Sequence, residues 1–597
     1  MERLSDFKPI AHLELPDLGE IDCSGLILVV GPNSSGKSQF LQDIFQRISG
    51  EPRKLVVARR LELAVPQYEP LIKALEREGY FESFEDESGA RQLKPLTTYL
   101  GTGQPVGPIP ISQGMTWLQS MPAPTASYRR RIDFLYYFGR LLVTALFLDR
   151  RLNAANQVGL IDFETQPPQA DMHALYVDDT ARKQLLNESL ESFGKAVWPD
   201  TSRGNVLCLR VSDQGVLPTA EERLSPRAMS RFRTIETEGD GLKSYVATCI
   251  ALLLGRRPVC VIDEPEMCLH PPQAYQLGRF IGRFGTSPDT VTLVATHSSH
   301  VLRGVIQTTS KVQIVRLTRR GGEFHAHMLP PQALADVLAR PTVRAEAVLD
   351  GVFAQAVIVV EADSDRHVYQ TVWETLVDDH HLDVHFAAVG GVGGIADTCR
   401  FYRTLRIPTA VIADLDVITD LRRLQRILDA LTDDHDAKIA ILQKAIDVLN
   451  LLRGLNPQIS PDDVRTQLAE IGTLSMDWTK GDDDALGRRL RGVANRVDRL
   501  REIKRGGVTA LAAEVARPVS ALLEALSTVG LFVVPVGELE EWLKDFSIAI
   551  SKENKWAWAN EAARVVKEAT VRDGDIWAFV KTIIGYLKAR LEAFPTT

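Results

Sequence analysis

Hydrophobic residues form short runs separated by polar turns, in two successive series along the chain. In the first series, strands are predicted at 26–30, 206–211, 259–262 and 291–295, and helices at 39–48 and 242–254. In the second series, strands are predicted at 357–360, 384–389, 409–413 and 531–536, with helical segments between them. Strands that alternate with helices indicate an α/β protein with parallel sheets.

Two helical stretches interrupt this alternation. Residues 126–200 are mostly helical and polar in pattern, and we expect a helical insertion there, with dimer contacts as one role for it. Residues 421–526 predict a second helical insertion. A short helical link near residue 340 divides the chain into domains of residues 1–340 and 341–597. No sustained heptads occur, so long coiled-coil arms are not expected.

Composition narrows the class of protein only a little. A chain of 597 residues, 45% hydrophobic, is too long for one core, so two or three domains are expected. The six cysteines show no Cys-x-x-Cys spacing, which predicts reduced thiols in the cytoplasm and no zinc site. Neither a signal peptide nor a membrane span is expected. A net charge of −8 argues against a general nucleic-acid coat.

One local stretch is strongly basic. Residues 488–505 hold eight basic and two acidic residues, and their apolar residues recur at helical spacing. This pattern predicts an amphipathic helix whose basic face contacts phosphates without reading bases. An ordinary solvated helix face explains the same pattern equally well.

The first chemical motif is the run Gly31-Pro32-Asn33-Ser34-Ser35-Gly36-Lys37-Ser38, which matches a P-loop between a buried strand and a helix. Glycines let backbone amides approach phosphates, the lysine neutralises the outer phosphates, and the serine can hold Mg²⁺. We therefore expect nucleotide contacts at Asn33, Ser35, Gly36, Lys37 and Ser38.

A second strand ends in two carboxylates, Asp263 and Glu264. Asp263 is expected to bind Mg²⁺, directly or through water, and Glu264 to polarise the attacking water. His297, at the end of the next strand, can contact the terminal phosphate.

The run Asp263-Glu264-Pro265-Glu266 continues into Leu269-His270-Pro271, and it resembles ABC-type ATPase heads, within them the OLD-like and recombination-type branch. In such heads a signature loop of one subunit caps the nucleotide of another, which implies a homodimer or higher homo-oligomer. The best match is Gly239–Ser244, with nucleotide contacts at Gly241 and Ser244, although it departs from the common Leu-Ser-Gly-Gly pattern. Gln113 is a candidate glutamine-loop residue, but an ordinary polar loop residue is the more frequent case.

Acidic residues follow strands again in the second half. Glu361 ends one strand and Asp365 lies four residues later, a glycine cluster at 390–394 follows the next strand, and Asp414 and Asp416 end a third. Residues two apart in an extended segment face the same side, so Asp414 and Asp416 can converge on one cation. Hard divalent ions prefer carboxylate oxygens, and two such ions can cleave a phosphodiester.

This order of motifs resembles the TOPRIM (topoisomerase-primase) fold, a Rossmann-like domain. The resemblance implies Mg²⁺ at Glu361, Asp365, Asp414 and Asp416, with Mn²⁺ or Ca²⁺ substituting or assisting. Ala362 departs from the glycine that is usual there. The segment 533–542 resembles the last strand and acidic segment of OLD (overcoming lysogenization defect) nuclease domains, where Glu538 or Glu540 would complete the metal site. Lys552 or Lys555 would stabilise the phosphate, and we assign that catalytic role to Lys555.

Together these likenesses imply an OLD-family protein: an ABC-type ATPase head followed by a TOPRIM nuclease domain. They imply ATP and Mg²⁺ as cofactors, DNA as substrate, and an ATP-regulated endonuclease of the class found in Gabija-type anti-phage systems, which work beside a superfamily-1 (UvrD-like) helicase protein. Two alternatives remain open. One is a ribonuclease that cuts tRNA as a defence effector, and the other is a DNA-clamping ATPase without cleavage.

Overall fold

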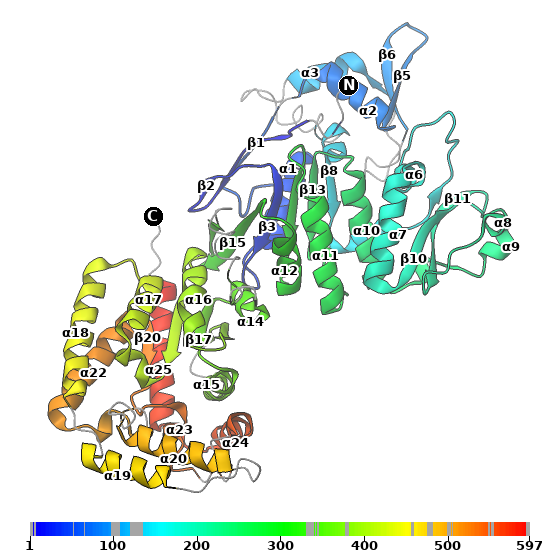
Figure 1. Cartoon of the computed structure of the whole chain (residues 1–597). Coiled ribbons are helices and arrows are strands. Elements are labelled where there is room, and N and C mark those ends of the chain that lie inside the picture. Colours follow the sequence, from blue (N-terminus) through cyan, green and yellow to red (C-terminus); the bar gives the residue numbers. More distant parts are fainter. Residues whose placement is uncertain are drawn as a thin grey trace. The chain divides into compact units, whose positions relative to one another are not determined.

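A computed structural model of the chain separates it into two compact units, residues 1–339 and 340–596 (Figure 1). The structure describes residues 4 and 7–592, except 52, 65, 97–107, 120–134, 136, 330–339, 341, 343–344, 377–380, 455–458, 474–481, 498–502, 504–505, 547, 549 and 551–553. Each unit is built around a mainly or wholly parallel sheet.

The first unit contains a six-stranded central sheet. In spatial order its strands are β16 (Glu323–Leu329), β15 (Val312–Arg320), β3 (Gly25–Val30), β14 (Val291–Ala295), β13 (Val259–Asp263) and β8 (Val143–Leu146). Every neighbouring pair is parallel except β15 and β16. The near-continuous apolar runs of β3, β13 and β14 are those of strands buried on both faces. The strands predicted at 26–30, 259–262 and 291–295 are thus confirmed.

Helices cover this sheet. The helix α1 (Lys37–Ile48) packs its buried residues Phe40, Leu41 and Ile44 into one core with β3, β13 and β14. The helices α10 (Asp240–Leu254), α11 (Pro271–Phe284) and α12 (Ser299–Thr308) are drawn in green in Figure 1. The predicted helices at 39–48 and 242–254 are confirmed as α1 and α10.

Three smaller antiparallel sheets complete the first unit. One comprises β2 (Gly19–Glu20), β1 (Ile10–Leu15) and β4 (Arg60–Leu63), and a second comprises β5 (Phe81–Glu85), β6 (Arg91–Pro95) and β7 (Ile109–Pro110). The third comprises β9 (Val158–Gly159), β10 (Lys195–Asp200), β11 (Val206–Asp213) and β12 (Arg233–Thr234). The helices α2 (Tyr68–Arg77) and α3 (Ile111–Gln119) lie beside the β5–β7 sheet, and two short helices, α8 (Ala220–Arg223) and α9 (Pro226–Met229), follow β11.

The prediction of a mostly helical insertion over residues 126–200 missed three strands. This stretch contains β8, which pairs in parallel with β13 and so belongs to the central sheet, as well as β9 and most of β10. A run of four residues is too short for its periodicity to stand out among polar neighbours. The described remainder holds η3 (Gly139–Leu142), α5 (Leu148–Ala154), α6 (Asp171–Val177) and α7 (Asp179–Phe193).

The second unit has a four-stranded parallel sheet in the order β18 (Val384–Ala388), β17 (Ala356–Val360), β19 (Thr409–Ala413) and β20 (Leu531–Val533). The four strands predicted for this half are confirmed. One core joins β17, β19 and β20 to three helices, α15 (Asp363–Thr375), α24 (Lys555–Glu568) and α25 (Asp575–Glu592). The helix α16 (Val392–Thr404) follows β18, and the short elements α14 (Glu346–Leu349) and η5 (Asp350–Phe353) form the helical link before β17.

Within the stretch 421–526, every described regular element is helical. These elements are α17 (Leu421–Leu431), α18 (His435–Arg453), α19 (Pro461–Gly472), α20 (Asp482–Val497), η9 (Val508–Ala510) and α22 (Ala513–Thr528). The helix α22 leads into β20 and contacts α18, which ties the helical stretch to the sheet.

The basic stretch lies partly on α20, and its burial differs from the prediction. The arginines Arg488, Arg489 and Arg491 are exposed, as expected. Leu490 and Val497 were expected on a docked apolar face, yet they are 42% and 44% exposed, whereas Val493 is buried. Ile503 is also buried, and Leu500 lies outside the described residues. The apolar face of this helix is therefore only partly covered.

Across the described part of the chain, none of the helices is both long enough and apolar enough to span a membrane. All six cysteines are free thiols, and four of them are buried.

Candidate functional site

The loop between β3 and α1 has the backbone of a phosphate-binding loop. Gly31 and Gly36 have φ angles of +138° and +95°, in the region that side chains disfavour. A Cβ atom at Gly31 would lie 2.1 Å from the carbonyl oxygen of Leu317, so only glycine fits there. Gly36 is the residue before α1, and Asn33 is exposed beside the buried Ser35. The loop thus directs backbone amides at the helix N-terminus, where an anion is stabilised.

Lys37 is the first residue of α1, and its side chain is turned into the loop. Its ammonium group donates hydrogen bonds to the carbonyl oxygens of Gly31 and Pro32, each at 2.8 Å. Burial lowers the pKa of Lys37 to about 8, although the charges of Glu264, Glu266 and Asp263 oppose this shift. The charge is therefore held in a poorly solvated position, where it acts strongly on a phosphate.

The two predicted magnesium residues of the ATPase meet. The hydroxyl of Ser38 donates a hydrogen bond to Asp263 at 2.9 Å, although 225 positions separate these residues. Burial raises the pKa of Asp263, and the Ser38 hydrogen bond opposes that shift. A hydroxyl and a carboxylate in contact at the edge of the loop are oxygen ligands of the kind that Mg²⁺ prefers.

Glu264 and His297 also come together. Nε2 of His297 lies 2.9 Å from Oε1 of Glu264. Burial and the charge of Lys37 lower the pKa of His297, while Glu264 raises it. Glu264 has a φ of +48°, in the left-handed region, and its amide donates to Ala295 at 2.8 Å. A non-glycine residue in this conformation costs on the order of 1 kcal/mol and is typical of functional sites.

Arg151 holds this strand end in place, and no sequence motif had pointed to it. The side chain lies in α5, is fully buried, and donates to the carbonyl oxygens of Leu146, Asp263 and Glu264, the last at 2.9 Å. Its Nε donates to the hydroxyl of Ser244 at 2.7 Å. One guanidinium therefore joins the backbone of Asp263 and Glu264 to Ser244 of α10.

This contact changes the interpretation of the signature segment. Gly239–Ser244 is the cap and first turn of α10, and Ser244 is fully buried within its own subunit. A Cβ atom at Gly241 would lie 2.5 Å from the carbonyl oxygen of Cys268, so the helix start packs against the loop that follows Glu264. The hydroxyl of Ser244 accepts a hydrogen bond from Arg151 within its own subunit, and its contact with a partner's nucleotide stays a prediction.

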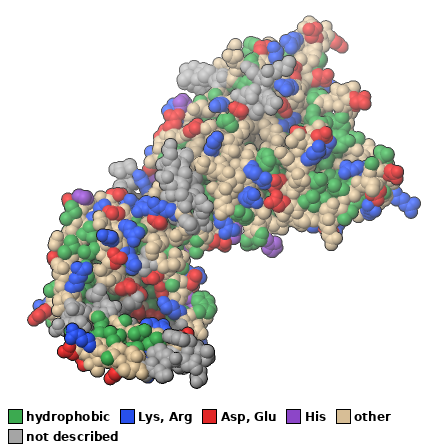
Figure 2. All heavy atoms as spheres, in the orientation of Figure 1, with side chains coloured by type: hydrophobic (Ala, Val, Ile, Leu, Met, Phe, Trp, Pro, Cys, Tyr) green, Lys and Arg blue, Asp and Glu red, His purple; other side chains and the backbone are tan. Residues whose placement is uncertain are grey.

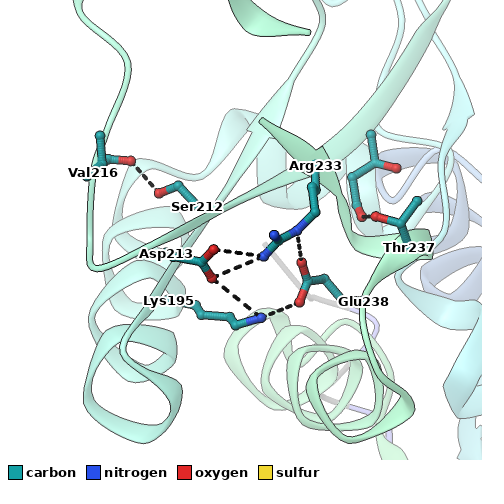
Figure 3. A network of polar contacts seen from close by, with 8 residues as sticks. Lys195, Ser212, Asp213, Val216, Arg233, Thr237 and Glu238 are labelled. Carbon is teal, nitrogen blue, oxygen red and sulfur yellow. Dashed lines mark hydrogen bonds and ion pairs between the residues drawn. The ribbon is translucent and has the colours of Figure 1, made fainter. Parts of the chain in front are cut away.

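A charged network fixes the residue that precedes this segment. Glu238 receives hydrogen bonds from Lys195 and from Arg233, the latter at 2.6 Å, and Arg233 also contacts Asp213 at 3.0 Å (Figure 3). Burial raises the pKa of Glu238, but these two hydrogen bonds outweigh it and leave the pKa below its ordinary value. The network ties β10, β11 and β12 to the start of α10.

Gln113, the candidate for the glutamine loop, lies exposed on α3. No hydrogen bond connects it to the residues above in the described structure.

The second site lies at the carboxyl ends of the parallel strands in the second unit. The amide of Gly391 donates to the carbonyl oxygen of Glu361 at 2.9 Å, which joins the loop after β18 to the end of β17. Gly390 and Gly391 have φ angles of +66° and +125°, so glycine is required there. Ala362 has a φ of −131°, which any residue adopts. Alanine in place of the usual glycine therefore strains nothing.

Asp365 lies in the first turn of α15 at the centre of this site. Its carboxylate accepts the amide of Ala362 at 3.1 Å and caps the helix. Burial raises the pKa of Asp365 to about 6; the charges of Glu361 and Glu540 add to this shift, and Lys555 opposes it. Carboxylates from β17, α15 and the segment after β20 are thus close enough to repel one another.

The prediction for Asp414 and Asp416 used the wrong local structure. Asp414 directly follows β19, but the next residues form the 3₁₀ helix η7 (Leu415–Thr419), so this segment is not extended. Both side chains are half-buried. Burial raises the pKa of Tyr369, and the charges of Asp365 and Asp414 add to this shift, which places Asp414 near α15. A metal shared by Asp414 and Asp416 stays a prediction.

The remaining candidates for the nuclease site are Glu538, Glu540, Lys552 and Lys555. Glu538 precedes α23 (Leu539–Trp542), and Glu540 lies in its first turn, where its charge raises the pKa of Asp365. Lys555 is the first residue of α24 and lowers that pKa. Lys552 lies outside the described residues. Glu540 and Lys555 thus lie near Asp365, and the choice between them and Glu538 or Lys552 stays a prediction.

Among the described residues, no three histidine, cysteine, aspartate or glutamate side chains lie close enough to hold a metal ion as they stand. The donor set nevertheless suits a hard divalent cation, because the acidic side chains supply only oxygen ligands. Burial and the charges of Glu361 and Glu540 raise the pKa of Asp365, so its ionised form is disfavoured in this position. A cation would stabilise that ionised form.

The sequence analysis also missed two aromatic residues near Asp365. Tyr369 is fully buried, and its hydroxyl accepts a hydrogen bond from the indole nitrogen of Trp542 at 3.2 Å. The spacing of Asp365 and Tyr369, one helical turn apart, was the available signal.

Two family models match the chain. The model described as "Overcoming lysogenization defect protein-like, TOPRIM domain" matches residues 352–416, which hold Glu361, Asp365, Asp414 and Asp416. The model described as "AAA domain, putative AbiEii toxin, Type IV TA system" matches residues 176–303, which hold Asp263, Glu264 and His297. No curated protein matches the chain.

Solved structures similar to the chain include heads of SMC proteins. The SMC head domain from Thermotoga maritima is 15% identical, with 54% of this chain and 100% of that chain covered and a TM-score of 0.27. A Pyrococcus furiosus Smc head bound to the C-terminal domain of ScpA is 10% identical, with 55% and 98% covered and a TM-score of 0.29. The family models and the two sheets confirm the predicted fold class, an α/β ATPase head followed by a TOPRIM domain.

Proposed function

Because the chain joins an ATPase domain to an OLD-like TOPRIM domain in the order of OLD-family ATPase–TOPRIM proteins, we propose that it is an ATP-regulated, divalent-metal-dependent DNA endonuclease. The observation that carries the proposal is the group of acidic residues around Asp365, together with one lysine. A buried carboxylate at a strand end whose pKa is raised by burial and by neighbouring acidic side chains is typical of a catalytic centre.

In the nuclease, Glu361, Asp365, Asp414, Asp416 and Glu540 would hold the divalent cations. Bound cations supply the activation of water and the stabilisation of the leaving oxygen. Asp365 is oriented by its hydrogen bond from the amide of Ala362.

Two residues around these carboxylates have supporting roles. Lys555 offers a positive charge to the phosphate beside the carboxylates. Tyr369, buried beneath them, keeps the site rigid through its contact with Trp542.

In the ATPase, Lys37 neutralises the phosphates of ATP, and Ser38 and Asp263 would hold Mg²⁺. Glu264 polarises the attacking water, and His297, in contact with Glu264, lies where it can reach the terminal phosphate. The P-loop geometry and the Ser38–Asp263 hydrogen bond support this assignment.

The distribution of charged side chains on the surface affects how the protein could bind DNA. On the face that Figure 2 shows, basic and acidic side chains are interspersed over both units, and the net charge is −8. DNA contacts then depend on local groups, such as the exposed Arg488, Arg489 and Arg491 of α20.

We further propose a dimer of ATPase heads in the cytoplasm, a role in anti-phage defence, and a superfamily-1 helicase protein as partner. The free cysteines support the location, and the likeness to the OLD class supports the rest.

Cleavage of supercoiled plasmid by the full-length protein, with Mg²⁺ or Mn²⁺, tests the nuclease. We compare wild type with Asp365→Asn and with the matched variant Asp363→Asn, whose side chain is 67% exposed and pairs only with Arg366 among the contacts described. Asp365→Asn should abolish cutting, and Asp363→Asn should retain it. Equal cutting by all three proteins would overturn the proposal. Cutting of total tRNA but not of plasmid would replace DNA by RNA as the substrate, and ATP-dependent DNA binding by a wild type that cuts neither would indicate a clamp.

A further inference from the structure

One tryptophan near the acidic site is exposed to solvent. Trp556, the second residue of α24, is 55% exposed, whereas Trp558, two residues later in the same helix, is 3% exposed in the core. Helix periodicity explains the burial of Trp558 but gives Trp556 no packing role. Exposure alone assigns no role, but tryptophan is enriched at binding interfaces, so the place of Trp556 decides what it can do.

The position of Trp556 is set by its neighbours. It directly follows Lys555, whose charge acts on the carboxylate of Asp365. The helix α24 packs along α15, the helix that Asp365 begins. On α15, His367 lies two residues after Asp365, and its ring packs against that of Trp556 with centroids 5.8 Å apart and planes at 35°. The indole is therefore held beside the nuclease site rather than free to turn away.

A ring in this place suits one ligand chemistry in particular. The scissile phosphate must lie at the acidic site, so the nearest parts of the substrate beyond the phosphate are the sugar and base of the flanking nucleotides. A base that remains stacked in a duplex cannot present its face to a protein ring, whereas an unpaired base can. Every base has a π face, so such stacking tolerates any sequence.

We propose that Trp556 is a stacking platform for an unpaired nucleobase next to the cut site. The substrate class is then a nucleic acid with single-stranded or extruded nucleotides at the point of cleavage. This inference rests on the proposed nuclease function. His367 supports the indole from α15, and Lys555 offers its charge to the adjoining phosphate.

Binding of two short, fluorescently labelled polymers tests the platform. One is single-stranded DNA, and the other is an abasic deoxyribose-phosphate chain of the same length and charge. Anisotropy is measured with Ca²⁺, and strand integrity is checked on a gel. Trp556→Ala should weaken binding of the DNA between about fivefold and about 150-fold, the range for loss of one stacked base. Its binding of the abasic chain should not change, and Trp556→Phe should retain most of the affinity for DNA.

Two controls keep the test specific. Phe84→Ala removes another exposed aromatic side chain, 37% exposed on β5 in the first unit, and should affect neither polymer. Thermal unfolding of Trp556→Ala confirms that the protein is folded. A single-stranded RNA of the same length distinguishes the two sources of the base: a loss larger for RNA than for DNA assigns the platform to an RNA strand.

The outcomes separate this inference from the proposed function. An equal loss for DNA and the abasic chain would give Trp556 a structural role, and no loss for either would exclude a contact; both results overturn the platform. In both of these outcomes the nuclease proposal stands if the wild-type protein cuts plasmid. If wild type neither cuts nor binds any of the polymers, both proposals fail.

Discussion

The two candidate sites are built in opposite ways. In the ATPase, groups of opposite or complementary character already touch: Ser38 donates to Asp263, His297 contacts Glu264, and Arg151 holds the backbone of both acidic residues. In the nuclease unit, burial raises the pKa of Asp365 to about 6, and the like charges of Glu361 and Glu540 add to this shift.

The two sites differ in whether their charged groups are already compensated before a ligand binds. The hydrogen bonds of the ATPase fix its catalytic groups before the nucleotide binds, which is electrostatic preorganisation. The nuclease carboxylates destabilise one another until a cation compensates them. A site of the second kind is switched by whatever positions its metal and its substrate, and so it suits control by a neighbouring ATPase.

The largest effect is expected for Lys37→Ala. Lys37 is buried within the P-loop, and we expect it to supply the charge nearest the phosphates. ATP hydrolysis should fall on the order of 100- to 1000-fold, the loss typical of one preorganised charge or donor. Steady-state phosphate release measures it. Plasmid cutting in the absence of ATP should persist, and loss of both activities together with a lower melting temperature would show that the change only unfolds the protein.

A smaller effect, on the order of 10- to 100-fold in kcat, is expected for Arg151→Lys. Lysine cannot bond at once to the carbonyl oxygens of Asp263 and Glu264 and to Ser244, so Glu264 loses its orientation but ATP keeps its contacts. The value of KM for ATP should change little.

The neighbouring Arg150, exposed and stacked on Phe45, provides the matched control Arg150→Lys. That variant should hydrolyse ATP like wild type. A rise in KM with unchanged kcat in Arg151→Lys would instead assign Arg151 to nucleotide binding.

The smallest effect concerns stability against pH in the metal-free nuclease. The pKa of Asp365 is about 6 in the folded chain against an ordinary 3.8, so the folded state holds the proton more tightly. Stability from this group is complete below about pH 4 and is lost as pH rises through 6. In EDTA, the melting temperature should therefore fall from pH 4 to 7 more steeply for wild type than for Asp365→Asn.

Added Mn²⁺ should restore the melting temperature of wild type mainly above pH 6, where the carboxylate is ionised and the proton no longer competes. Identical pH profiles for wild type and Asp365→Asn would contradict the crowding of charge at this site.

Structural features that depend on neighbouring residues could be predicted from the sequence, whereas features that depend on contacts between distant segments could not. Strands such as β3 and β13 were predictable because an apolar run directly precedes a loop with special backbone needs, as at Gly31 and Gly36. By contrast, β8 was missed, since its membership of the central sheet depends on pairing with β13, more than a hundred residues away. Local patterns do not encode such pairing.

The sites divide in the same way. The order of Glu361, Asp365 and Asp414 along the chain follows from strand ends and could be predicted. The role of Arg151 could not be predicted, because its side chain donates to backbone carbonyl oxygens, and every residue has a carbonyl oxygen. The sequence predicted an extended segment at Asp414 and Asp416, but the chain forms the 3₁₀ helix η7 from Leu415.

The central claim is that ATP controls the cutting of DNA. The most direct test is the rate of cleavage of supercoiled plasmid with Mg²⁺ or Mn²⁺, with and without ATP, for wild type and for Lys37→Ala. We expect ATP to change the rate for wild type and to have no effect on Lys37→Ala, which still cuts. A wild-type protein that cuts at the same rate with and without ATP would contradict the account.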